Sequence, residues 1–81
     1  MTRLTLYGKP GCHLCDEARA DLAAVRESHP FELEEVDVTA DPRLWRDYGE
    51  RIPVVDIDGE EVLELHVNRA ELRRLLDRVA P

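Results

Sequence analysis

The stretch "YGKPGCHLC", residues 7–15, contains both cysteines of this 81-residue chain. Residues 3–7 alternate apolar and polar side chains, which predicts a strand. Residues 8–11 contain a proline and two glycines, which predict a loop. Residues 12–28 repeat apolar side chains at helical spacing, so we expect a helix to begin at the first cysteine. The two cysteines therefore lie where a strand and its loop lead into a helix.

A second strand and a short helix are predicted next. Residues 31–38 are rich in β-prone side chains, but the apolar alternation slips at Glu34-Glu35, so we expect a bulge there. The acidic side chains of this segment are typical of a strand at the edge of a sheet. Residues 41–49 predict a short helix, with Asp41 as its N-terminal cap.

The last third of the chain predicts a hairpin and a final helix. Two β-prone runs within residues 51–65 flank Asp58-Gly59, a strong signal for a two-residue turn. Asn68 and Glu71 have the spacing of a capping box, which begins the last helix. The expected apolar stripes are Leu14, Ala18, Leu22 and Val25 on the first helix, and Leu72, Leu75, Leu76 and Val79 on the last.

The order of elements is strand, helix, strand, helix, strand, strand, helix. A strand–helix–strand start implies a right-handed crossover between parallel strands, whereas a tight hairpin joins antiparallel strands. We therefore predict an α/β fold with a mixed four-stranded sheet and helices on both faces. A chain of this length forms one domain, residues 1–81.

The composition argues against two classes of binding partner. The formal net charge is −7, from 18 acidic and 11 basic residues, which disfavours binding to nucleic acids and to anionic membranes. The N-terminal residues alternate, unlike a signal peptide, and no run approaches the roughly 18 to 20 apolar residues of a membrane span. We expect a cytoplasmic monomer. In that compartment a Cys-x-x-Cys pair is typically catalytic or metal-binding rather than a structural disulfide.

Cys12 and Cys15 are placed for different tasks in thiol–disulfide exchange. Unpaired backbone N–H groups and the positive end of the helix dipole would stabilise a thiolate at Cys12, and Lys9 would add a positive charge. Cys15 lies one turn further into the helix and should be more buried. Cys12 would then attack a substrate disulfide, and Cys15 would resolve the mixed disulfide.

The same cysteines leave other classes of function open. Cys12, His13 and Cys15 are three candidate metal ligands, but structural zinc takes four, usually as two separated pairs, so we predict no metal site. A non-enzymatic binding module, or a carrier of a metal or iron–sulfur cluster between subunits, would use the same residues. A redox sensor, whose disulfide switches partner binding, is a further alternative.

The sequence resembles the glutaredoxin branch of the thioredoxin superfamily. The active-site loop "LYGKPGCHLC" looks like a glutaredoxin motif, with Lys9 at the position of its frequent lysine. The segment "RIPVV" resembles the family's loop that ends in a cis-proline, which would be Pro53. "GCHLCDEA" is similar to a group of small bacterial glutaredoxin-like proteins. The resemblance implies the thioredoxin fold, β-α-β-α-β-β-α, over nearly the whole chain.

The resemblance also implies a thiol–disulfide oxidoreductase that acts on disulfide-containing proteins or small thiols. Cys12 would be the nucleophile and Cys15 the resolving thiol, and the backbone of Ile52 beside Pro53 would pair with an extended substrate. No cofactor would be bound. The family's Gly-Gly pair is missing from "VLELHVNRAEL", which leaves glutathione, another low-molecular-weight thiol or a disulfide reductase open as the source of electrons.

Two further residues are candidates for the substrate site. A protonated His13 would lower the pKa of the neighbouring Cys12 thiol, although an exposed side chain on the first helical turn needs no such role. Arg51, next to Ile52, would attract an anionic group such as a carboxylate, although a solvated surface arginine is an equal alternative.

Overall fold

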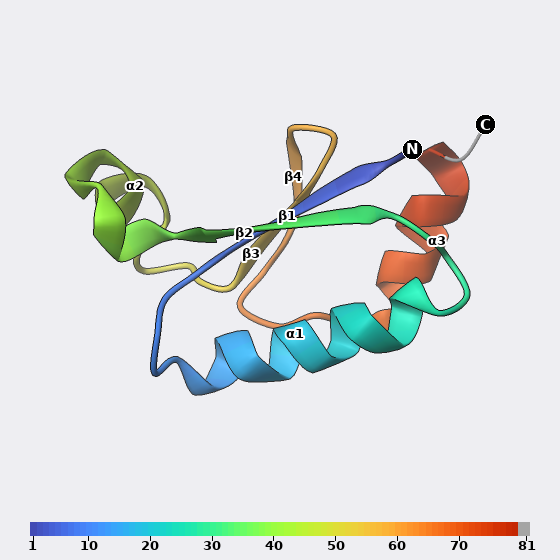
Figure 1. Ribbon diagram of the computed structural model, residues 1–81, viewed down its shortest axis with the longest axis horizontal. Coiled ribbons are helices and arrows are strands. Elements are labelled where there is room, and N and C mark those ends of the chain that lie inside the picture. Colours follow the sequence, from blue (N-terminus) through green and yellow to red (C-terminus); the bar gives the residue numbers. More distant parts are fainter. Residues whose placement is uncertain (80–81) are drawn as a thin grey trace.

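The computed structural model describes residues 1–79, and its elements follow the predicted order (Figure 1). A 3₁₀ turn, η1, which the sequence did not predict, lies between the second strand and the short helix. Asp37 caps this turn by accepting a hydrogen bond from the backbone N–H of Thr39 at 2.8 Å. The elements are β1 (Arg3–Gly8), α1 (His13–Arg26), β2 (Glu32–Asp37), η1 (Val38–Ala40), α2 (Pro42–Tyr48), β3 (Val54–Ile57), β4 (Glu60–Glu64) and α3 (Arg69–Val79).

The four strands form one mixed sheet in the order β2-β1-β3-β4. β1 pairs with β2 in parallel and with β3 antiparallel, and β3 pairs antiparallel with β4. Asp58 and Gly59 at the hairpin turn have φ values of 51° and 91°, the left-handed geometry that a tight two-residue turn requires. The predicted α/β sheet is therefore confirmed, including the hairpin and the acidic edge strand.

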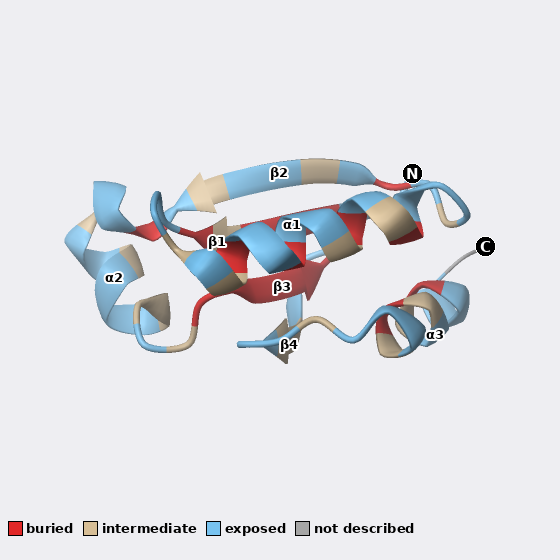
Figure 2. Cartoon of the chain, turned by 90° about the horizontal axis from the view of Figure 1, so that it is seen from below, coloured by how far each residue is buried: buried red, intermediate tan, exposed pale blue. Residues whose placement is uncertain are grey.

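One face of the sheet carries the main core, with α1 and α3 packed against it (Figure 2). The stripe of α1 is shifted by one residue from the prediction at its start, because Cys15 is fully buried whereas Leu14 is half-buried. On α3 the end of the predicted stripe is also wrong, since Val79 is 45% exposed. The buried members of this core are Leu4, Leu6, Ala18, Leu22, Val25, Phe31, Val55, Ile57, Leu72 and Leu76.

The bulge expected in the second strand is absent from its pairing with β1. The register from Arg3↔Glu32 to Gly8↔Asp37 is continuous, and the irregularity lies between β3 and β4 instead. Glu35 takes the place of an apolar residue on the face toward α1, where it accepts a hydrogen bond from Arg19 at 2.8 Å. The alternation slips because an ion pair, rather than an apolar contact, fills this position.

The opposite face of the sheet is covered only at one end. Tyr48 of α2 stacks on Tyr7 of β1, with ring centroids 4.1 Å apart. Farther along the same face, Thr5 and Asp56 are buried cross-strand partners and border an open hollow of about 510 Å³. The helix α2 lies at the end of the sheet that also carries the loop before Cys12 (Figure 1).

Within residues 1–79, the helices are too short or too polar to cross a membrane.

Candidate active site

Cys12 and Cys15 are joined by a disulfide across the first turn of α1, with Cα atoms 5.2 Å apart. Cys12 is the N-terminal cap of the helix, and its Sγ accepts a hydrogen bond from the backbone N–H of Cys15 at 3.1 Å. Cys12 is half-buried and Cys15 is fully buried, as the sequence predicted. This arrangement leaves one sulfur within reach of a substrate and protects the other.

Gly8 at the end of β1 makes room for the buried sulfur. A Cβ atom at residue 8 would lie 3.0 Å from Cys15 Sγ, which is tighter than normal packing. The glycine therefore accommodates the close approach of the helix to the strand and does not serve an unusual backbone angle. The sequence showed this residue only as part of a loop.

The loop before β3 reaches the cysteines from the other half of the chain. The Ile52–Pro53 peptide bond is cis, as the resemblance implied. Ile52 is 8% exposed and packs in one cluster with Cys15 and Val38, while Cys12 packs against this cluster from its edge. Within residues 1–79, the backbone N–H and C=O of Ile52 have no hydrogen-bond partner. Backbone groups without a partner are the groups that pair with an extended chain in β-strand addition.

Lys9 and His13 flank the disulfide but make contacts of their own. The Lys9 ammonium lies 5.5 Å from the ring centroid of Trp45 on α2. The His13 side chain is 89% exposed and lies 3.4 Å from a carboxylate oxygen of Glu17. Both residues stand beside the active-site loop, and their roles toward the thiolate and the substrate stay predictions.

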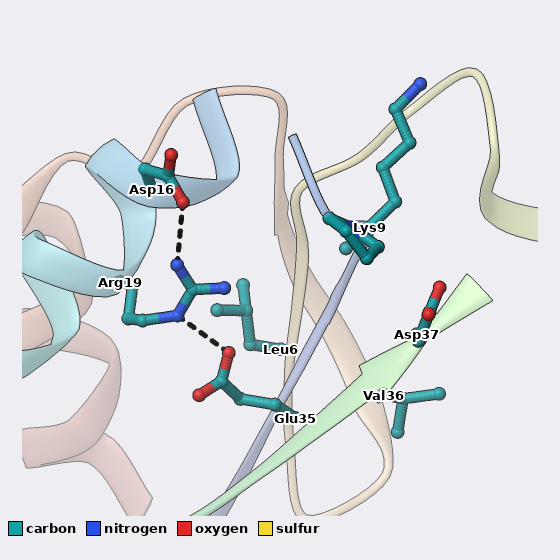
Figure 3. Close-up of a pocket in the computed structure, with 9 residues that line it drawn as sticks. Leu6, Lys9, Asp16, Arg19, Glu35, Val36 and Asp37 are labelled. Atoms are coloured by element: carbon teal, nitrogen blue, oxygen red, sulfur yellow. Dashed lines mark hydrogen bonds and ion pairs between the residues drawn. The ribbon is translucent and has the colours of Figure 1, made fainter. Parts of the chain in front are cut away.

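A hollow of about 360 Å³ lies on the side of this loop that faces β2 (Figure 3). Arg19 lies in it between Asp16 and Glu35, at 2.8 Å from each carboxylate, and these partners raise the pKa of its guanidinium. The Lys9 side chain extends away from these charges. The charge of Arg19 is already neutralised, and three carboxylates line the hollow. The hollow therefore offers little attraction to an anionic substrate.

Arg51 is held by residues of this chain. Its guanidinium donates to Glu61 at 2.9 Å, to Glu64 at 3.2 Å and to the carbonyl of Asp47 at 2.6 Å, and hydrogen bonds to the two glutamates raise its pKa. It also lies 5.4 Å from the ring centroid of Tyr48. These contacts fasten the loop before Ile52 to β4, and an anion would have to compete with them.

Tyr7 and Asp56 form a polar pair beside the cysteine cluster. The Tyr7 hydroxyl donates to Asp56 at 3.2 Å, while the other carboxylate oxygen of Asp56 is buried without a partner. Burial is the largest cause that raises the pKa of Tyr7, and the hydroxyl of Tyr48 and the charge of Asp56 raise it further. Asp56 is therefore a buried carboxylate, only 5% exposed.

Three residues of α2 were missed as parts of the site. Leu44 and Tyr48 pack against the cluster around Cys15, and Trp45 meets Lys9. No local pattern links this helix to the cysteines, because they are some thirty residues apart in the chain.

The described residues hold no group of three or more His, Cys, Asp or Glu side chains arranged to bind a metal ion.

Comparison with known proteins finds a family and individual proteins that this chain resembles. The family described as "Glutaredoxin-like domain (DUF836)" matches residues 3–77. An uncharacterized protein of Mycobacterium tuberculosis is 30% identical over 76 residues, which cover 88% of this chain and 78% of that protein.

Solved structures show the same fold. The protein XcR50 of X. campestris has a TM-score of 0.81 and 36% identity, covering 96% of this chain and 99% of its own. Chloroplastic thioredoxin z has a TM-score of 0.76 at 16% identity, covering 96% of this chain and 77% of that chain, which shows the fold alone. The chain belongs to the glutaredoxin-like domain family, has the thioredoxin fold, and carries a Cys-x-x-Cys disulfide that indicates a redox function.

Proposed function

We infer that this protein is a thiol–disulfide oxidoreductase that reduces mixed disulfides of proteins or of low-molecular-weight thiols. The observation that carries this proposal is the asymmetry of the two sulfurs. Cys12 is half-buried and accepts a backbone N–H at the start of a helix, whereas Cys15 is fully buried within disulfide distance of it. The free backbone groups of Ile52 support binding of an extended substrate beside Cys12.

The reaction begins from the reduced dithiol. The Cys12 thiolate attacks one sulfur of the substrate disulfide, and the other substrate sulfur leaves as a thiolate that takes up a proton. Cys15 then loses its proton and attacks Cys12 Sγ, which releases the second substrate thiol and forms the Cys12–Cys15 disulfide. The substrate has gained two electrons and the protein has lost two. Two molecules of a low-molecular-weight thiol such as glutathione, which end as their own disulfide, or a disulfide reductase, return the protein to the dithiol.

Two serine variants test this division of labour. With hydroxyethyl disulfide and a disulfide-linked peptide as substrates, Cys12→Ser should abolish turnover. Cys15→Ser should accumulate a mixed disulfide, and because the chain has only two cysteines, any adduct found by mass spectrometry lies on Cys12. Full reductase activity in Cys12→Ser would refute the mechanism, as would bound iron with visible absorbance, or bound zinc found by elemental analysis, in the purified protein.

A further inference from the structure

Trp45 is an exposed aromatic side chain next to the active-site loop. It is the single tryptophan of the chain and is 46% exposed. Leu44 and Tyr48 of the same helix pack against the cluster around Cys15. Large aromatic side chains that remain half in water are enriched where proteins bind partners. The helix thus connects this ring to the redox site through packed side chains.

The ring of Trp45 packs beside Gly49 and Lys9. Gly49 has an ordinary helical φ of −51°, but a Cβ atom there would lie 2.7 Å from the Cδ2 atom of Trp45. The same Cβ atom would lie 2.5 Å from the carbonyl oxygen of Trp45, so the glycine leaves room for both the carbonyl and the ring. Lys9, three residues before Cys12, places its ammonium 5.5 Å from the ring centroid. A ring that already packs between α2 and the active-site loop loses less freedom than an unpacked ring when a ligand covers it.

The charge of Lys9 is not neutralised by any carboxylate of residues 1–79. The chain has 18 acidic side chains, yet within residues 1–79 none lies within ion-pair distance of Lys9. Arg19 and Arg51, which lie near the same site, each contact two carboxylates. The ammonium of Lys9 is thus available to a carboxylate that arrives with the substrate.

We propose that Lys9 and Trp45 form a docking platform for the polypeptide that flanks the substrate's disulfide, with a preference for a large apolar side chain beside a carboxylate. This proposal rests on the oxidoreductase function inferred above. The apolar side chain covers the ring of Trp45, and the carboxylate pairs with Lys9. A polypeptide fits better than glutathione, because glutathione supplies carboxylates but has no large apolar side chain to cover the ring.

The test compares substrates of different size on one reduced enzyme. A disulfide-linked peptide with phenylalanine and aspartate beside its cysteine is compared with the same peptide carrying lysine for aspartate, and with hydroxyethyl disulfide. Trp45→Ala should lower kcat/KM for the Phe-Asp peptide by about threefold to tenfold more than for hydroxyethyl disulfide. Lys9→Gln should remove the preference for the aspartate peptide over the lysine peptide. Val79→Ala, a truncation of an equally exposed side chain on α3, should leave all three rates unchanged.

A binding measurement separates this proposal from the redox function. An S-methylated Phe-Asp peptide, which cannot react, is titrated while the fluorescence of Trp45 is followed; the emission should shift to the blue as the ring is covered. Trp45→Phe keeps an aromatic surface and should retain part of the preference, which guards against a folding defect in Trp45→Ala. Unchanged fluorescence, or equal losses for the peptides and hydroxyethyl disulfide, would overturn the platform and leave the oxidoreductase standing. Lack of turnover with every substrate would instead overturn the redox proposal on which it rests.

Discussion

At the scale of single residues, the surroundings of each sulfur decide what it can do. Cys12 is at the cap of a helix, where its Sγ accepts a backbone N–H, and Cys15 is enclosed among apolar side chains. The sequence predicted both positions because the motif itself marks the boundary between loop and helix. It could not predict Asp56 as a buried residue, since the partner that justifies its burial, Tyr7, is 49 positions away.

The pair formed by Tyr7 and Asp56 should contribute to stability. Tyr7→Phe removes the donor to one carboxylate oxygen of Asp56, whose other oxygen is already without a partner. We expect a loss of about 1–3 kcal/mol in the free energy of unfolding, measured by urea titration of the reduced protein. In an Asp56→Ala background the same change should cost much less. Equal costs in both backgrounds would show that the two groups are not coupled.

At the scale of elements, the sequence predicted the four strands and the three α-helices but not the 3₁₀ turn η1, and its other errors concern which side chains face inward. The bulge was placed in β2, where an ion pair between Arg19 and Glu35 replaces an apolar contact, and the stripe of α1 was started one residue early. Both errors arise from tertiary partners that periodicity does not reveal. By contrast, Asn68 caps α3 as predicted, because it accepts the backbone N–H of Glu71 at 2.9 Å.

The cap of α2 should make part of the stability depend on pH. Asp41 accepts the backbone N–H of Arg43 at 2.8 Å, and this bond, followed by the Arg43 side chain, lowers the pKa of the carboxyl below its ordinary 3.8. A lowered pKa in the folded state stabilises the protein above 3.8, and this contribution is lost as the pH falls through the depressed value. Asp41→Asn keeps a neutral acceptor at any pH.

Urea midpoints of the two proteins, measured at neutral pH and at a pH below that carboxyl's ordinary value, test this expectation. The native protein should lose more stability on acidification than Asp41→Asn, since all other carboxylates are common to both. Equal losses would mean that the charge of Asp41 adds nothing to the cap. Urea unfolding measures stability directly, so this test does not depend on any enzymatic activity of the protein.

At the scale of the whole molecule, the sheet brings three distant parts of the chain to one site. The start of α1, the helix α2 and the loop before β3 meet around Cys15, while the rest of α1 and α3 cover the main core. The fold class and the cysteine pair followed from the sequence. The part of the site contributed by α2 did not, because the chain carries no local signal of where a connecting helix will pack.

A core truncation tests whether the chain unfolds as one unit. Leu22 of α1 is fully buried between the sheet and α3, so Leu22→Ala should lower the free energy of unfolding by about 2–5 kcal/mol. The fluorescence of Trp45, at the site end, and far-UV circular dichroism should report the same transition. Val79→Ala should stay within about 0.5 kcal/mol of the native protein. Separate transitions by the two probes would contradict the prediction of a single domain.

The central claim is that the fold activates Cys12 as a nucleophile. The most direct measurement is the rate of alkylation of Cys12 against pH in the reduced protein, with the adduct assigned by mass spectrometry. Cys15→Ser serves as the matched control, since it keeps the backbone N–H that bonds to Cys12 Sγ. We expect a pKa for Cys12 well below the ~8.5 of a free cysteine in both proteins. A pKa at or above that value would show an unactivated thiol and contradict the oxidoreductase proposal.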